Sequence, residues 1–470
     1  MQTGLLHEDR LFPSDPDQRT IARELYADIR DLPIISPHGH TDPSWFALNE
    51  PFPNPTELLI APDHYVFRML YSQGVSLDAL GVPRADGSRP DTDPREAWRT
   101  LASHYHLLRG TPSRMWLDHV FSEVFGLSER LNTSTADHYY DTIDTALKTE
   151  DFRPRALFDR FNIELLSTTE GATDSLSHHE AIQASDWDGR VISAYRPDAV
   201  NDAEHEDFQT ALDTFGELTG EDTRSWKGYL NAHRKRREDF KAVGTTSSDH
   251  GHISARTADL DASDAQTLFE WVTSGKASAE DADLFRAQML TEMARMSLDD
   301  GLVMQIHPGA RRNHNDPLFH SHGRDKGADI PGPTGYVDEL KPLLNRFGND
   351  PRLTLIIFTL DETSYSRELA PLAGHYPALR LGPAWWFHDS PEGMRRFREQ
   401  TTETAGFYNT VGFNDDTRAF LSIPARHDVA RRVDCAFLAR LVAEHRLPLD
   451  EAHEVARALA YDLVKAAYKV

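Results

Sequence analysis

The sequence contains one cysteine, Cys435, among its 470 residues. An intrachain disulfide is therefore impossible, and the composition fits a reducing compartment. No run of about 18 apolar residues occurs, so we expect no transmembrane helix. The first twenty residues lack a basic segment followed by a long apolar stretch, so we expect no secretory signal peptide. Together these absences predict a cytoplasmic protein.

Positive charge is scarce relative to negative charge, and the formal net charge is −25. This balance argues against nonspecific binding of nucleic acid, which needs a basic surface. It also means that a site for an anionic ligand must gather arginines locally. Hydrophobic residues make up 39% of the chain and charged residues 27%, which predicts a large folded core rather than disorder.

Eight short β-rich apolar runs that end in polar residues recur along the chain. They are Pro33–His40, Ile163–Glu170, Val191–Pro197, Ala242–His250, Val303–Gly309, Leu353–Glu362, Leu379–Phe387 and Thr410–Arg418. Segments with the apolar spacing of helices separate them. Eight alternating units predict an α/β fold, a (β/α)8 TIM barrel whose active site lies at the carboxyl ends of the strands. An open doubly wound sheet is the alternative, but it would need a glycine-rich phosphate loop that the sequence lacks.

Two long segments interrupt this alternation. A large insertion of about residues 41–162 follows the first strand, and we expect it to be mostly helical. A second segment, about residues 198–241, is strongly charged and also has helical spacing. Neither has enough continuous apolar periodicity to stand alone, so we expect residues 1–470 to fold as a single barrel domain.

The strongest local motif is His38-Gly39-His40 at the end of the first strand. Side chains alternate along a strand, so the two imidazoles share one face and can hold a divalent cation. The alternative interpretation is a pair of surface histidines in a turn. Metal-dependent barrels of the amidohydrolase superfamily have the same arrangement at this position, and the sequence resembles them.

This resemblance implies further ligands at later strand ends, where His307 and Asp416 stand. The carboxylated lysine or glutamate that usually follows the fourth strand has no clear counterpart, because Asp249 and His250 are there instead. The sixth run ends without a histidine. The resemblance therefore implies one divalent metal ion, with zinc expected. Its predicted ligands are His38, His40, His307 and Asp416.

A more specific resemblance covers nearly the whole chain. The sequence is similar to the uronate isomerase (glucuronate isomerase) family, and six spaced motifs carry the similarity. They are Asp63-His64-Tyr65 with Arg68, Tyr195-Arg196-Pro197-Asp198, Ser248-Asp249-His250, His307 with Gly309-Ala310-Arg311-Arg312-Asn313, Trp385-Trp386-Phe387 with Asp389, and Asp416-Thr417-Arg418 with Phe420-Leu421-Ser422. Pro308 and Asp415 depart from the family pattern.

The resemblance implies a reaction that interconverts D-glucuronate with D-fructuronate, and D-galacturonate with D-tagaturonate, by proton transfer through an enediol. Such a reaction needs a base near two carbons and a group that polarises the carbonyl. The predicted catalytic residues are Asp416, Tyr65 and Arg418. Asp416 is the candidate base, although it can also be a metal ligand, and a water bound to the metal can carry the proton instead.

The substrate implied is a small sugar acid, and the resemblance also implies a homo-oligomer. Arginine binds carboxylates best because its donors are bidentate. The predicted substrate-binding residues are Arg196 and Arg418 for the carboxylate with Arg68 and Arg311 in reserve, His64, Asp249 and His307 for hydroxyls, and Trp385 and Trp386 for the apolar face of the sugar.

Structural interpretations of the same residues stay open at this stage. Asp416 and Arg418 can pair with each other and cap a helix, Arg196 can lie on the surface, and Tyr65 can be a packed aromatic. We expect only one of the two tryptophans to face a ligand. Two other functions also remain, namely a metal-dependent hydrolase of the same superfamily and a noncatalytic sugar-acid binding protein.

Overall fold

The computed structural model describes residues 4–470 and builds them around a parallel sheet. The strands are hydrogen-bonded in the order β1-β2-β3-β4-β5-β8-β9, and each neighbouring pair is parallel. Their bounds are β1 (Ile34–Ser36), β2 (Ile163–Gly171), β3 (Val191–Arg196), β4 (Ser247–His250), β5 (Val303–Ile306), β8 (Leu355–Ile357) and β9 (Leu379–Leu381). Each strand falls within, or within one residue of, a run that the sequence predicts.

The eighth predicted strand, Thr410–Arg418, is not a regular strand. It forms one parallel bridge, between Leu381 and Thr410, and one backbone hydrogen bond to the loop after β1. The backbone φ is +78° at Gly412 and +39° at Asp416, values that interrupt an extended conformation. The segment nevertheless lies between β9 and the loop after β1, so eight β/α units form the TIM-barrel-like fold.

The strands are short, and their side chains are buried on both faces. Every residue of β4, β5 and β8 is buried. This pattern is typical of parallel sheets, whose outer face is covered by helices. The helices that contact strands directly are α8 (Pro154–Arg160), α9 (Ser177–Gln183), α12 (Trp226–Ala242), α14 (Ala279–Asp300), α17 (Ala370–Ala373) and α19 (Ile423–Ala443).

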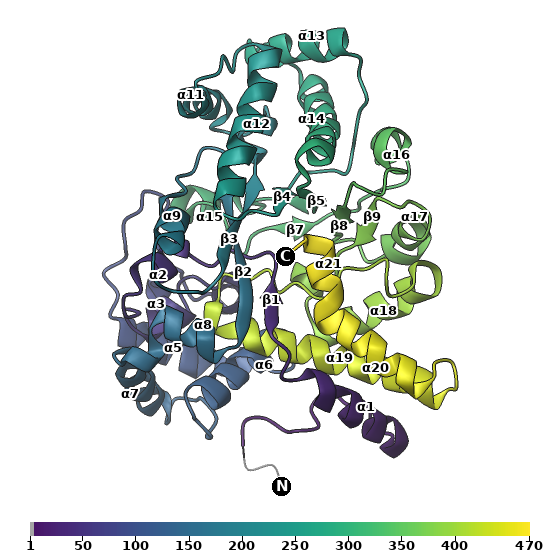
Figure 1. Cartoon of the computed structure of the whole chain (residues 1–470). Helices are drawn as coiled ribbons and strands as arrows, with labels where there is room; N and C mark the ends of the chain where they lie inside the picture. Colours follow the sequence, from purple (N-terminus) through teal and green to yellow (C-terminus); the bar gives the residue numbers. More distant parts are fainter. Residues whose placement is uncertain (1–3) are drawn as a thin grey trace.

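The segment after β1 is helical, and Figure 1 shows it gathered beside the strands. Its helices are α2 (Pro43–Leu48), α3 (Pro55–Leu59), α4 (His64–Tyr71), α5 (Pro94–His104), α6 (Pro112–His119) and α7 (Ala136–Leu147). Trp98 and Phe121 belong to its apolar core, which also includes Ile34 of β1 and Leu166 of β2. The insertion therefore buries its apolar side chains against the barrel.

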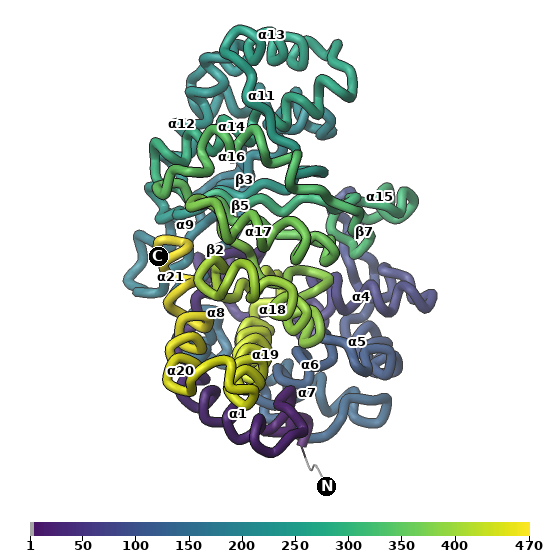
Figure 2. The backbone as a smooth tube through the Cα atoms, turned by 90° about the vertical axis from the view of Figure 1, so that its right-hand side faces the viewer, coloured from purple at the N-terminus to yellow at the C-terminus, as the bar shows by residue number. Residues whose placement is uncertain are grey.

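A second group of helices lies at the opposite end of the molecule from α1 (Pro16–Ile29) and α20 (Leu449–Arg457), as Figures 1 and 2 show. It consists of α11 (Phe208–Thr219), α12, α13 (Ala262–Thr273) and α14, and α10 (Asp198–Asn201) leads into it. The remaining elements are α15 (Asp316–His322), α16 (Lys341–Phe347), α18 (Pro391–Ala405), α21 (Leu463–Tyr468) and the antiparallel pair β6 (Ala310–Arg311) and β7 (Ile330–Pro331). Among residues 4–470, no helix combines the length and the apolar character needed to cross a membrane.

Candidate active site

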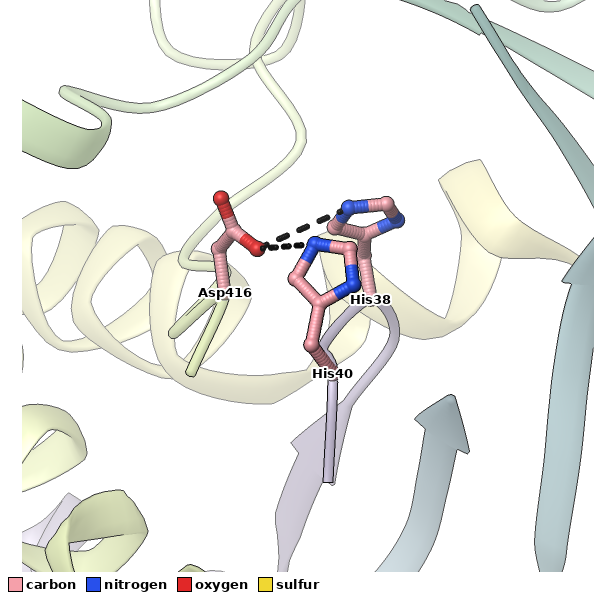
Figure 3. Close-up of side chains that lie close together, drawn as sticks. All are labelled: His38, His40 and Asp416. Carbon is pink, nitrogen blue, oxygen red and sulfur yellow. Dashed lines mark ion pairs between the residues drawn. The ribbon is translucent and has the colours of Figure 1, made fainter. Parts of the chain in front are cut away.

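Two histidines, His38 and His40, lie in the loop that follows β1. Their rings lie edge to face with centroids 5.3 Å apart, and both turn toward Asp416 (Figure 3). The backbone N–H of His40 donates to the carbonyl of Thr417 at 3.0 Å. A Cβ on Gly39 would lie 3.3 Å from that same carbonyl oxygen, so glycine allows this close approach between the two chain segments.

Asp416 lies opposite the two imidazoles. Its Oδ1 is 3.2 Å from Nε2 of His40 and 3.6 Å from Nε2 of His38, and its Oδ2 accepts a hydrogen bond from the indole N–H of Trp385. Burial alone would raise the pKa of Asp416, but the contacts with His40 and His38 and the Trp385 hydrogen bond hold it far below its ordinary value. The carboxylate is therefore ionised at any pH near neutrality.

The backbone of Asp416 has a φ of +39°, in the left-handed region. Aspartate and asparagine tolerate this conformation better than other residues with a Cβ. The side-chain oxygen of Asn414 accepts a hydrogen bond from the Asp416 N–H at 2.9 Å and supports the turn. This local geometry points the carboxylate back toward the histidine loop instead of along the strand.

The three side chains form a donor set that fits a divalent metal ion. Their ligand atoms all lie within 4.8 Å of one another. Burial, opposed by Asp416, lowers the pKa of His40, so that imidazole is neutral near pH 7 and can offer a lone pair. The Asp416 Oδ1 is buried and forms no well-oriented hydrogen bond to the described residues. Two imidazoles and a carboxylate are ligands that a metal such as zinc accepts.

His307 lies close to this cluster but faces another partner. Its ring centroid is 6.1 Å from that of His38, and its Nε2 lies 2.7 Å from Oδ1 of Asp249. Asp249 is fully buried on β4. Burial would raise the pKa of Asp249, but the imidazoles of His307 and His38 hold it well below its ordinary value. The structure thus places His307 beside the three clustered donors rather than among them.

Arg196 ends β3 and is held by two carboxylates. Its Nε donates to Asp198 at 2.8 Å, and its guanidinium lies 3.6 Å from Asp249. Asp198, His250 and His252 form a second set of closely spaced donors. Because the guanidinium of Arg196 already occupies Asp198, we interpret this second set as support for the arginine and not as a cation site.

Helix α4 positions two of the predicted residues in its first turn. The Asp63 carboxylate accepts a hydrogen bond from the Tyr65 N–H at 2.8 Å and caps the helix. The rings of His64 and Tyr65 are stacked with centroids 4.5 Å apart. Burial raises the pKa of Tyr65 although the Arg426 guanidinium opposes it, so the phenol keeps its proton. Burial and Arg418 lower the pKa of His64 to about 3, so this imidazole is neutral.

Two tryptophans form an aromatic wall of the site. Trp385 is 5% exposed, and Trp386 is half-buried with a φ of +54°. Their ring centroids are 5.3 Å apart, and the Arg312 guanidinium lies 4.8 Å from the ring of Trp386. Both tryptophans line the pocket, where we expected only one to face a ligand.

A cavity of about 310 Å³ opens between these elements. The predicted residues that line it are His38, His40, His64, Tyr65, Arg196, His307, Trp385, Trp386, Asp416 and Arg418. The cavity therefore brings the ionised Asp416 and the neutral phenol of Tyr65 together with several arginines, which are Arg196, Arg312, Arg324 and Arg418. This combination can bind a small polar anion and transfer a proton within it.

Three predicted residues do not line the cavity: Asp249, Arg68 and Arg311. Asp249 is fully buried on β4 and contacts His307 and Arg196, which do line the cavity. The Arg68 guanidinium lies over the rings of Tyr65 and Phe387 at 5.8 and 5.1 Å, so it supports the wall from behind. Arg311 is exposed at the end of β6, whereas Arg312, the first residue after the strand, lines the cavity and pairs with Asp329 at 2.8 Å.

The sequence analysis missed an acidic residue of the site, Asp325. Its Oδ2 lies 2.7 Å from the Arg418 guanidinium, so this arginine pairs with Asp325. Burial would raise the pKa of Asp325, but Arg418 and Arg312 hold it well below its ordinary value. A charged tripeptide between two glycines, Gly323 to Gly327, is the only local signal for this loop, and such a pattern is common in ordinary turns.

Comparison with known proteins gives matches over the whole chain. The model of the glucuronate isomerase family matches residues 14–468. A uronate isomerase of Xanthomonas axonopodis pv. citri (strain 306) is 70% identical over 465 residues, which is 99% of this chain and 98% of the relative. The crystal structure of glucuronate isomerase from Caulobacter crescentus is 69% identical with a TM-score of 0.98, and the match covers 99% of this chain and 97% of the other.

A more distant structure shares the fold alone. It is described as a metal-dependent hydrolase from Lactobacillus casei ATCC 334, and it is 14% identical with a TM-score of 0.51 over 95% of this chain and 97% of the other. This likeness concerns the barrel fold and not the activity.

Proposed function

The chain belongs to the glucuronate isomerase family and is an aldose–ketose isomerase of uronates, and we propose that the reaction takes place in the cavity above His38. The observation that carries this proposal is the shared cavity. It places the ionised Asp416, the neutral Tyr65 and the guanidinium groups of Arg196 and Arg418 around one space of about 310 Å³. A uronate has an anionic end and a carbonyl end, and the cavity has groups for both.

The carboxylate of the sugar acid binds at Arg418, with Arg196 as a second cation. Arg418 lines the cavity, is 38% exposed and uses one terminal nitrogen for Asp325, so its other donors remain available to a ligand. Arg196 is 23% exposed and is already held by Asp198 and Asp249. Arg418 therefore has more donors left for a bidentate contact with the substrate carboxylate.

Asp416 accepts the proton that leaves C2 of the aldose and returns it to C1. As the C2–H bond breaks, its electrons form the C1–C2 double bond and the carbonyl electrons move to O1, giving an enediolate. Return of the proton to C1, with transfer of a hydroxyl proton from O2 to O1, completes the ketose. The phenol of Tyr65 donates a hydrogen bond to the oxygen that becomes negative.

The donor set of His38, His40 and Asp416 holds one divalent ion in this proposal, and zinc fits the two imidazoles and the carboxylate best. When bound, such an ion would supply positive charge that stabilises a developing negative charge on the substrate. Asp416 has two oxygens, and Oδ2, which accepts from Trp385, differs in surroundings from Oδ1, which faces the imidazoles. One carboxylate can therefore act at a metal and at the substrate through different oxygens.

Three further properties belong to this proposal. The chain acts as a homo-oligomer, it works in the cytoplasm, and residues 1–470 fold as one domain with insertions at about 41–162 and 198–241. The shared core of the first insertion and the barrel supports the single domain. The single cysteine, which is buried, fits a reducing compartment. Light scattering of the purified protein measures the oligomeric state.

The decisive experiment supplies the purified protein with D-glucuronate and, separately, with D-galacturonate. We expect D-fructuronate and D-tagaturonate as the products. Folded protein that forms no ketose from either sugar acid would overturn the proposal. Parallel incubation with esters, lactones and amides tests the hydrolase alternative, and we expect no hydrolysis because the arginine pair suits a carboxylate and not a neutral acyl group.

A further inference from the structure

A short loop, Gly323–Gly327, lies between α15 and β7 and lines the cavity with Arg324 and Asp325. Its backbone adopts φ values of +79° at Gly323, +60° at Asp325 and +72° at Gly327. A non-glycine residue in this region is uncommon and is held there by its surroundings. The surrounding contacts therefore hold the loop in this conformation, and Asp325 is the non-glycine residue among these three with positive φ.

Three contacts fix the loop over the cavity. Arg324 pairs with Glu206 at 3.0 Å, on the side of the helical segment that follows β3. Asp325 pairs with Arg418 at 2.7 Å, on the side of the eighth unit. Gly327 packs on α4, where a Cβ would lie only 2.7 Å from the Cβ of Arg68. The loop is thus seated on the helix that carries Tyr65.

Asp325 has an oxygen free for a ligand. Its Oδ2 accepts from Arg418, whereas Oδ1 accepts no hydrogen bond from the residues that the structure describes. The side chain is 45% exposed and lines the cavity. A carboxylate accepts hydrogen bonds only, so the natural partner for Oδ1 is a hydroxyl group of the substrate.

We propose that Asp325 is a specificity-determining residue that accepts a hydrogen bond from the C4 hydroxyl of the uronate. This inference rests on the proposed function, in which Arg418 binds the substrate carboxylate. Because the uronate carboxylate and Asp325 would both bind the guanidinium of Arg418, they would lie side by side. The carbons next to the carboxylate, C5 and then C4, are therefore the ones that come within reach of Asp325.

The C4 hydroxyl is the position that distinguishes the two substrates. D-Glucuronate and D-galacturonate differ only in configuration at C4, so an acceptor at a fixed place meets this hydroxyl at a different angle in each sugar. A hydrogen bond that involves a charged partner changes rates by about 10- to 100-fold when it is lost. Asp325 accordingly sets the ratio of kcat/KM between the two sugar acids.

The test uses Asp325→Asn and Asp325→Gly, because both residues tolerate the positive φ that alanine would resist. We expect the ratio of kcat/KM for D-glucuronate to kcat/KM for D-galacturonate to change by about tenfold or more in both variants. The matched control is Asp350→Asn, which changes a half-buried aspartate that pairs with the exposed Arg352 at 2.6 Å and does not line the cavity. Its ratio should equal that of the wild type.

Two results would overturn the inference. An equal loss for both sugars would show that Asp325 only holds Arg418 in place. Unchanged or improved kcat/KM for both would show that Asp325 merely competes with the substrate for the arginine. Failure of the proposed function is a separate result, because the wild-type protein would then convert neither sugar acid.

Discussion

Replacing Asp416 with asparagine separates a catalytic base from a structural carboxylate. Asparagine tolerates the φ of +39° at this position, so the backbone of the turn is preserved. Its side-chain oxygen can still accept from the indole N–H of Trp385, and its N–H can donate to Nε2 of His40, which is neutral because burial lowers its pKa. The unfolding free energy should therefore change by only about 1 kcal/mol.

The expected loss of activity is much larger than this loss of stability. The amide that Asp416→Asn introduces cannot accept the C2 proton, and general base catalysis contributes about 10²- to 10⁴-fold to a rate. This corresponds to about 3–5 kcal/mol in the activation barrier. We expect kcat to fall by that factor for both uronates, with a smaller change in KM.

The assay combines steady-state kinetics, thermal unfolding and solvent deuterium. The wild type should place deuterium at C1 of the ketose or C2 of the aldose, unless the base shields the proton, and Asp416→Asn should lose exchange together with turnover. Asp350→Asn serves as the surface control, since Asp350 lies outside the cavity. If Asp416→Asn still turns over and exchanges at near wild-type rates, Asp416 is not the base, and a water in the cavity would have to accept the proton.

Other predictions test the remaining parts of the site and the fold. The double variant His38→Ala plus His40→Ala should abolish stoichiometric binding of one divalent ion, measured by elemental analysis, because two of three donors are removed; one ion per chain in the variant would place the metal elsewhere. Arg196→Met should mainly raise KM by about tenfold or more, since it removes a charged donor to the substrate; an unchanged KM would exclude it from carboxylate binding. Glu170→Gln should make stability less dependent on pH. Burial raises the pKa of Glu170 from 4.5 to about 7, so its stabilising effect is present below pH 4.5 and is lost as the pH rises to about 7. This contribution to the unfolding free energy amounts to at most about 3 kcal/mol. Denaturant unfolding of the wild type and Glu170→Gln at pH 5 and pH 8 measures it. If the unfolding free energies of both proteins changed equally with pH, the raised pKa of Glu170 would be contradicted.

The strand-end histidines show why part of the site can be predicted from sequence. His38 and His40 are two residues apart after an apolar run, and this position predicts neighbouring imidazoles, although both residues lie in the loop just beyond β1 and not in the strand itself. The same reasoning places Arg196 at the end of β3 and His307 after β5, because parallel strands of a barrel end on one side. The local sequence pattern is enough to predict these positions, without knowing which residues the side chains contact.

Other features depend on contacts between distant segments. Asp325 is 93 residues from Arg418 in the chain, and no periodicity relates them. The irregular eighth strand follows from positive φ values at Gly412 and Asp416, and the alternation of Val411 and Phe413 that predicts a strand does not reveal them. Arg312 lines the cavity in place of Arg311 because it lies just after β6, where it pairs with Asp329 in a separate segment of the chain.

The pairing of the cavity arginines explains how a chain with a formal net charge of −25 can bind an anion. Arg196, Arg312 and Arg418 each contact a carboxylate of the protein at 2.7 or 2.8 Å. Such pairs hold the planar guanidinium groups in fixed orientations and leave other donors open, whereas unpaired arginines would repel one another and lose more conformational entropy when a ligand orders them. The acidic residues of the site therefore do not oppose the binding of a uronate. They orient the few cations that receive its carboxylate, and they offer acceptors for its hydroxyl groups.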